Sequence, residues 1–222
     1  TGIKNKDINK YRTALQDLRD KAIKINYPLK RCYYPHITND NVSAIESPFN
    51  QLISNKLIKK LFVSLELGNA IKDLMGWEKV YLHLARLFTM KRYKYLGDWH
   101  RDFESWDGEI ATMSTIQVGI YLKNQSGFRI VKPKFDKWGD SKDKIQKDEA
   151  PKSCLPLKLP KSHYSEINGK PGHVLFFAPG LMHQGNSDFD RLDFHLRFSK
   201  NETISNLKEN SYYYQKDINY FD

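Results

Sequence analysis

RLDFHLRF, residues 191–198, is the stretch that decides the fold class. Its charged or polar members, Arg191, Asp193, His195 and Arg197, alternate with leucines and phenylalanines. Because residues i and i+2 of a strand point the same way, this alternation predicts a strand with one apolar and one charged face. The charged face would ordinarily lie in solvent. If it lined a barrel interior instead, it would require a ligand, since unpaired buried charge is costly.

Further strands are predicted upstream, where β-branched and aromatic residues are enriched between turn residues. The stretch TIQVGIYL (115–122) is also two-faced, with Thr115, Gln117 and Gly119 on one face and apolar residues on the other. The other predicted strands are 80–90, 127–131 and 173–178. An interior polar face with an apolar back packed on helices is typical of a barrel that holds a polar ligand.

Apolar residues at helical spacing precede the strands, over 5–24, 50–63 and 67–75, and Gly76 is expected to end the last helix. Helices come first and strands follow, without βαβ alternation. We therefore expect a mainly β protein with flanking helices, in which a β-sandwich or barrel is buttressed by N-terminal helices.

One domain is expected over residues 1–222. It is expected to begin with a helical support (1–78), followed by a β core (79–200) and a polar tail (201–222). Within the core, residues 132–170 form a lysine- and proline-rich, lid-like insertion.

The composition favours a globular protein, because 40% hydrophobic and 13% aromatic residues can build a core. Cys32 and Cys154 are the only cysteines, so neither a disulfide framework nor a zinc knuckle is indicated. The chain contains no apolar run of about 18 residues and opens without a signal-peptide pattern. We expect a cytoplasmic protein.

The net charge of +10, from 36 Lys and Arg against 26 Asp and Glu, is compatible with nucleic acid, an anionic membrane or small anions. The lysines, however, are spread along the whole chain and are not interleaved with stacking aromatic residues. A generic basic surface is therefore predicted, and neither nucleic acid nor a membrane is expected as a partner.

GDWHRDFESW, residues 97–106, contains His100 and Asp102 two positions apart. On a strand both would share one face, and with a second histidine they would form the facial triad of non-haem Fe(II) oxygenases. The pair alone also fits a turn or a surface hydrogen bond. His183 supplies the second histidine, and Arg191 follows it. An arginine fork can hold a dicarboxylate, and a structural salt bridge to Asp188, Asp190 or Asp193 is the alternative role.

The motifs WHRDFESW, GHVLFFAPGLMHQGN and R-x-D-F-x-L-R-F resemble the phytanoyl-CoA dioxygenase superfamily of Fe(II)- and 2-oxoglutarate-dependent oxygenases, over about residues 79–200. The first is especially similar to its ectoine-hydroxylase branch, and the last to members that tailor sugars. The resemblance implies a double-stranded β-helix (jelly-roll, cupin-like) barrel. It also implies Fe(II), 2-oxoglutarate as co-substrate, and O₂.

Carried over by motif, His100, Asp102 and His183 would ligate the iron, and Arg191 would bind the distal carboxylate of 2-oxoglutarate. Arg197 is the alternative anchor, because Arg191 follows His183 by only eight residues, fewer than is usual in the family. Further polar residues would help to bind co-substrate or substrate: Thr115, Gln117 and Arg86. Aromatic residues would wall the site and keep it dry: Trp99, Phe103 and Trp106. For Trp99 and Trp106, packing in the core is the alternative role.

The sequence therefore predicts a dioxygenase that hydroxylates a small polar or anionic metabolite, with sugar-related compounds among the candidates, and releases succinate and CO₂. Two alternatives stay open: a nucleic-acid-modifying enzyme with the same iron chemistry, and a non-catalytic jelly-roll binding module. A zinc hydrolase fits poorly, because no further His, Cys or Glu has a recognisable spacing for it. The chain is short for the family, which leaves completion of the pocket in a homo-oligomer open.

Overall fold

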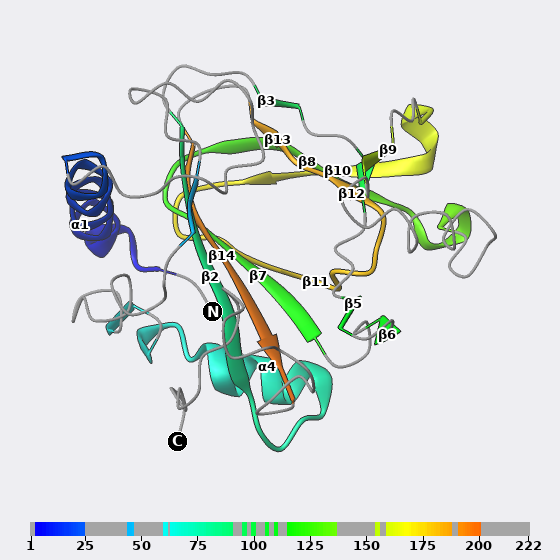
Figure 1. Cartoon of the computed structure of the whole chain (residues 1–222), viewed down its shortest axis with the longest axis horizontal. Coiled ribbons are helices and arrows are strands. Elements are labelled where there is room, and N and C mark those ends of the chain that lie inside the picture. The colour runs from blue at the N-terminus through cyan, green and yellow to red at the C-terminus, as the bar shows by residue number, and fades with distance from the viewer. Residues whose placement is uncertain are drawn as a thin grey trace.

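The computed structural model describes residues 3–24, 44–46, 60–61, 63–90, 95–96, 99–100, 105–106, 109–110, 115–136, 154–155, 159–187 and 191–200. Within these ranges the structure is mostly β, with few helices, and its strands pair antiparallel (Figure 1). Two five-stranded sheets contain most of the strands. In Figure 1 one sheet runs across the lower part of the view and the other across the upper part.

The first sheet has the order β1–β2–β14–β7–β11. Its strands are β1 (Ala44–Glu46), β2 (Tyr81–Met90), β14 (Arg191–Ser199), β7 (Thr115–Tyr121) and β11 (Val174–Phe177). The central strand β14 pairs with β2 on one side and β7 on the other, so the stretch that predicted a two-faced strand lies in the middle of this sheet.

The second sheet has the order β10–β8–β12–β4–β9. Its strands are β10 (Tyr164–Gly169), β8 (Gln125–Val131), β12 (His183–Gln184), β4 (Trp99–His100) and β9 (Cys154–Leu155). Two small ladders and two 3₁₀ turns complete the β part: β13 (Asn186–Ser187) with β3 (Tyr95–Leu96), β5 (Ser105–Trp106) with β6 (Glu109–Ile110), η1 (Pro133–Phe135) and η3 (Lys161–His163).

Among the described residues, two helices have both ends defined, α1 (Asn5–Lys24) and α4 (Leu67–Met75). Both have the bounds expected from their apolar spacing. Helix α4 ends at Gly76, which adopts the left-handed conformation with φ of 66° and donates its N–H to the Lys72 carbonyl. Glycine is favoured there because a side chain would be strained at positive φ.

The main hydrophobic core joins the helices to the first sheet. Leu15 of α1 and Ile71 of α4 pack in one cluster with the apolar residues of β7 and β14, such as Val118 and Phe194. The apolar face of β14 is thus covered by this core. Its charged face therefore points the other way, and Arg191, Asp193 and Arg197 on that face are buried as well. A solvent-exposed charged face, the ordinary expectation for such a strand, is excluded.

The predicted strands 80–90, 115–122, 127–131, 173–178 and 191–198 are confirmed with shifts of one or two residues at their ends. Of the predicted helix 50–63, only residues 60, 61 and 63 are described, and they are helical. Part of the predicted lid segment 132–170 is not loop, since β10 pairs with β8 over most of its length. Residues 137–153 and the tail 201–222 lie outside the described residues. Closure of the sheets into a barrel stays a prediction.

Tyr121 of β7 connects the two sheets by lying directly against Gly169 of β10. A Cβ atom placed on Gly169 would overlap the Tyr121 ring. We expect Gly169→Ala to lower the free energy of unfolding by about 1–3 kcal/mol, because overpacking forces a buried side chain or a strand to shift. Urea denaturation monitored by circular dichroism measures this change.

Gly119→Ala is the matched control for that substitution. A Cβ atom at Gly119 would meet the Tyr121 hydroxyl at 3.5 Å and Leu175 at 3.8 Å, which are ordinary contacts. Equal destabilisation by the two alanines would show that the contact between Tyr121 and Gly169 is not tight.

Candidate metal centre and co-substrate site

His183 begins β12 just after the Pro179–Gly180 turn, and it is 3% exposed. Its Nδ1 lies 2.8 Å from the carbonyl oxygen of Leu181. A carbonyl oxygen can only accept a hydrogen bond, so Nδ1 carries the hydrogen and Nε2 carries the lone pair. Metal-binding histidines commonly have this arrangement, in which a second hydrogen bond fixes the tautomer and the ring orientation.

The backbone on both sides of this histidine is tied to neighbouring elements. The N–H of Met182 donates to the Asp136 carboxylate at 3.1 Å, and the carbonyl of Met182 accepts from Val131 at 2.9 Å. On the other side, Arg129 Nη1 donates to Gln184 Oε1 at 3.0 Å. These bonds to β8 and to the residue after η1 hold the His183 segment in place.

His100 is the register partner of His183, because β4 pairs antiparallel with β12. Residues directly opposite one another in such a pair have Cα atoms about 4.5–5.5 Å apart. The fold thus makes neighbours of two predicted ligands that are distant in sequence. Asp102 and the side chain of His100 lie outside the described residues. Among described residues, no group of three or more His, Cys, Asp or Glu could hold a metal ion.

Aromatic rings link His183 to the charged face of β14. The ring centroids of Phe128 and Phe177 lie 5.6 and 5.2 Å from that of His183. The Phe177 ring is also 6.3 Å from the ring of His195. Side chains of the second sheet therefore face the charged side of β14, and we call the space between them the interior.

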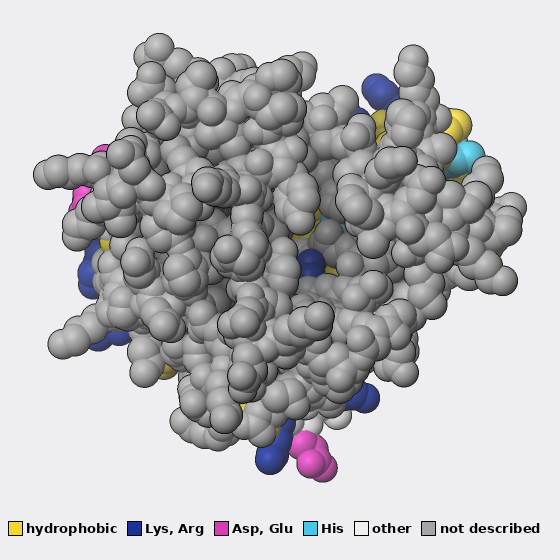
Figure 2. Space-filling view, viewed as in Figure 1, with side chains coloured by type: hydrophobic (Ala, Val, Ile, Leu, Met, Phe, Trp, Pro, Cys, Tyr) yellow, Lys and Arg dark blue, Asp and Glu magenta, His cyan; other side chains and the backbone are white. Residues whose placement is uncertain are grey.

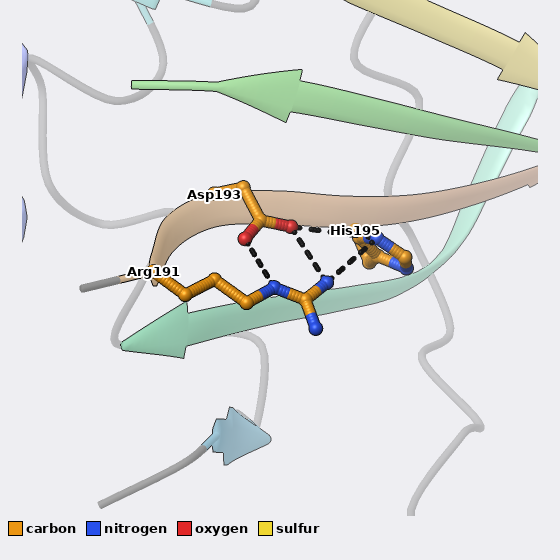
Figure 3. A network of polar contacts seen from close by, with 3 residues as sticks. All are labelled: Arg191, Asp193 and His195. Atoms are coloured by element: carbon orange, nitrogen blue, oxygen red, sulfur yellow. Dashed lines mark hydrogen bonds and ion pairs between the residues drawn. The ribbon is translucent and has the colours of Figure 1, made fainter. Parts of the chain in front are cut away.

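Arg191, Asp193 and His195 form a network in the interior (Figure 3). The Nε and Nη2 atoms of Arg191 donate to the two carboxylate oxygens of Asp193 at 2.6 and 3.0 Å. Nη2 also lies 3.2 Å from Nε2 of His195. The salt bridge to Asp193, one of the alternatives considered for Arg191, is present, whereas Asp188 and Asp190 lie outside the described residues.

The protonation of this network follows from its donors. Arginine can only donate, so Nε2 of His195 accepts from Arg191. A hydrogen bond from the same nitrogen to Asp193, 3.4 Å away, would need a hydrogen on Nε2, whereas the shorter contact to the obligatory donor Arg191 places a lone pair there. Complete burial raises the pKa of the Asp193 carboxyl, while the charge and hydrogen bonds of Arg191 oppose that rise.

Tyr121 lies near this network, and its side chain is buried. Burial raises the pKa of its hydroxyl well above the ordinary value, and the Asp193 charge adds to the rise while Arg191 opposes it. When folding raises the pKa of a group, the stability that this group contributes falls as the pH rises from its pKa in the unfolded state towards its pKa in the folded state. Above pH 10, Tyr121 should therefore lower stability by about 1.4 kcal/mol per pH unit.

Urea denaturation of the wild type and Tyr121→Phe at several values between pH 9 and pH 11 tests this. We expect the decline of stability above pH 10 to be shallower in Tyr121→Phe, since the variant lacks the titrating hydroxyl. Parallel curves would show that Tyr121 ionises normally in the folded protein.

The other predicted binding residues occupy the same face. Gln117 is the register partner of Arg197, and Thr115 is the partner of Ser199, and all four are buried. Arg86 of β2 is the register partner of His195, but its side chain lies outside the described residues. The structure thus brings Arg191, Arg197, Gln117 and Thr115 to one buried face, together with the backbone of Arg86.

Trp99 has the alternative role, because it packs in a core cluster and does not line the interior. Trp99 packs with Val131 and Met182, and its ring lies 5.3 Å from that of Tyr164. Met182 directly precedes His183, and successive residues of an extended strand point to opposite faces. Trp99 therefore supports the second sheet from the face opposite the interior. Phe103 and the side chain of Trp106 lie outside the described residues.

Sequence reasoning missed at least three aromatic residues of the interior, Tyr121, Phe128 and Phe177. Tyr121 could have been found, because it continues the alternation Thr115, Gln117, Gly119 by one step. Phe177 lies in an apolar run without alternation, VLFF, so no periodic signal distinguishes it. Its contacts with His183 and His195 appear only when the two sheets are brought together.

A hollow on the molecular surface lies over the interior. The visible face is hollowed near its centre, over the space between the two sheets, and basic and hydrophobic side chains show at the bottom of the hollow (Figure 2). The described Lys and Arg side chains otherwise lie at separate points around the edge of this face. Among described residues, no helix is long and apolar enough to cross a membrane.

Comparison with known proteins identifies similar sequences and folds. The chain is 26% identical over 179 residues to the ectoine dioxygenases of Bordetella parapertussis and Bordetella bronchiseptica, in a match that covers 68% of this chain. It spans only 55% of the length of these relatives. No family model matches.

Solved structures share the fold at lower identity. EctD from S. alaskensis with bound Fe has a TM-score of 0.64 at 18% identity, covering 95% of this chain and 73% of that one. HygX from Streptomyces hygroscopicus with nickel and 2-oxoglutarate has a TM-score of 0.56 at 13% identity, covering 93% and 86%. This chain has the fold of those two proteins. A mainly β, antiparallel architecture of that type is thereby confirmed.

Proposed function

We propose that this chain is an Fe(II)- and 2-oxoglutarate-dependent dioxygenase that hydroxylates a small polar or anionic metabolite. The observation that carries the proposal is the register pairing of His183 with His100 at the edge of an interior that contains a buried arginine. Two histidines from separate strands supply the nitrogen ligands that Fe(II) accepts. The arginine supplies the charge that a dicarboxylate needs.

The residues present fit these groups. His183 has the tautomer of a ligand that binds through Nε2. Together with His100 and Asp102 it would hold Fe(II), and Arg191 would bind the distal carboxylate of 2-oxoglutarate. Once bound, the iron and the co-substrate supply the O₂-dependent oxidation of a substrate C–H bond, with release of succinate and CO₂.

The protein contributes orientation and a dry environment. The hydrogen bonds around His183 fix its ring, and the salt bridge of Asp193 fixes the arginine. Phe128 and Phe177 cover His183 with apolar surface, which limits water near the reacting groups. Gln117 and Thr115 add polar atoms to the same face for co-substrate or substrate.

The substrate class is proposed from the similar proteins. The similar ectoine dioxygenases and EctD with 5-hydroxyectoine concern a small molecule, and HygX has been solved with hygromycin B. A small metabolite, sugar-related compounds included, is therefore our proposal for this chain. The lysines are spread along the sequence and are not interleaved with stacking aromatic residues, which does not favour nucleic acid.

Anaerobic titration of the apo-protein with Fe(II) and 2-oxoglutarate tests the function. We expect a visible metal-to-ligand charge-transfer band that needs both additions, and slow formation of succinate when O₂ is admitted. A folded protein that gives no band would contradict the oxygenase and leave the non-catalytic binding module.

A further inference from the structure

We propose that Asp193 determines which length of 2-oxo dicarboxylate the interior accepts, because it holds the Arg191 guanidinium in one orientation. The proposal rests on the proposed function and deepens it. It assigns Asp193 as a positioning residue that acts through Arg191, rather than as a group that touches the co-substrate.

The geometry of the network supplies the restraint. Asp193 is fully buried, and its two oxygens engage the Nε and Nη2 edge of the guanidinium at 2.6 and 3.0 Å. His195 accepts a further hydrogen bond from Nη2 at 3.2 Å. Three bonds thus hold the end of a side chain that is otherwise long and flexible. Figure 3 shows Nη1 pointing away from both Asp193 and His195.

A fixed guanidinium fixes the span available to a dicarboxylate. The 2-oxo acid end would bind at the metal site on β4 and β12, and the distal carboxylate would bind Arg191 on β14, a strand of the other sheet. One methylene more or fewer changes that span by about 1 Å, and misplacement on this scale can cost about 100-fold. Without the hydrogen bonds to Asp193, the guanidinium can move to meet carboxylates at different distances. The difference in affinity between dicarboxylates of different length should therefore fall.

A purely structural or charge-balancing role for Asp193 makes a different prediction. Oxaloacetate, 2-oxoglutarate and 2-oxoadipate carry the same charge and differ by one methylene each. A change in the charge of the interior would alter the affinity for all three by a similar factor. The ratio of their dissociation constants therefore separates positioning from charge.

The experiment measures the dissociation constants of these three acids for the Fe(II)-loaded full chain without oxygen, from the charge-transfer band. In the wild type we expect 2-oxoglutarate to bind at least about tenfold more tightly than either neighbour. In Asp193→Asn we expect weaker binding of 2-oxoglutarate and a preference reduced to about threefold or less. An unchanged ratio in the variant, or a wild type without preference, would overturn the proposal.

Two further variants keep the test decisive. His195→Ala removes the bond to Nη2 but leaves both bonds between Arg191 and Asp193. It should therefore lower the preference in the same direction but less, and it decides the matter if Asp193→Asn does not fold. Asp73→Asn removes one negative charge from the exposed side of α4 and should leave the ratio unchanged. A wild type that binds none of the acids contradicts the proposed function itself, whereas selective binding that Asp193→Asn retains contradicts only this inference.

Discussion

His183→Ala is expected to abolish the charge-transfer band with Fe(II) and 2-oxoglutarate, and with it succinate formation. Substitutions of groups that merely orient a metal ligand cost 10–100-fold in metal affinity. Removal of a ligand itself should therefore lower Fe(II) affinity by at least about 100-fold. The alanine also leaves the carbonyl of half-buried Leu181 without its hydrogen bond from Nδ1. Anaerobic titration of the variant, with circular dichroism to confirm that it is folded, measures the effect.

His173→Ala is the matched control, because His173 is exposed and lies just before β11. It should retain the band and its Fe(II) affinity. If folded His183→Ala bound Fe(II) and 2-oxoglutarate as the wild type does, His183 would not be a ligand and the proposed metal centre would be wrong.

Arg191→Gln is expected to weaken 2-oxoglutarate binding by about 30- to 5,000-fold, since loss of one partner of a buried charge pair costs about 2–5 kcal/mol. It should also lower the free energy of unfolding by about 3–5 kcal/mol, because Asp193 remains buried without its counter-ion. Isothermal titration of 2-oxoglutarate into the Fe(II)-loaded variant and urea denaturation measure the two effects.

Arg191→Lys separates these two effects. It keeps a positive charge beside Asp193 but lacks the planar fork that binds a carboxylate through two parallel bonds. We expect it to recover most of the stability and little of the 2-oxoglutarate affinity. An Arg191→Gln protein with normal affinity would shift the role of anchor to Arg197, which lies on the same buried face.

The strand and helix positions were largely predictable, because they depend on local periodicity. The period of two in 191–198 and the apolar spacing of 67–75 each indicate an element without reference to the rest of the chain. Strand β10 was not predicted, because its sequence YSEING has little apolar alternation. It is a strand because β8 offers it a register partner over most of its length.

The candidate site was only partly predictable, because local motifs identify residues but not the contacts between distant segments. His183 and Arg191 follow from motifs within one short stretch. The role of Trp99 stayed open between wall and core, because a motif does not say which face of its strand packs against a neighbouring element. The role of Asp193 as the partner of Arg191 stayed one of three alternatives until the structure was known.

The sequence by itself determined which residues of β14 share a face, since alternation is a property of a single extended backbone. The tertiary structure alone decided that the charged face is buried, because side chains of the second sheet face it while the helices cover the apolar one. It also decided that His100 lies opposite His183. Burial and register depend on contacts between segments distant in the chain, and no local pattern specifies which distant segment will provide them.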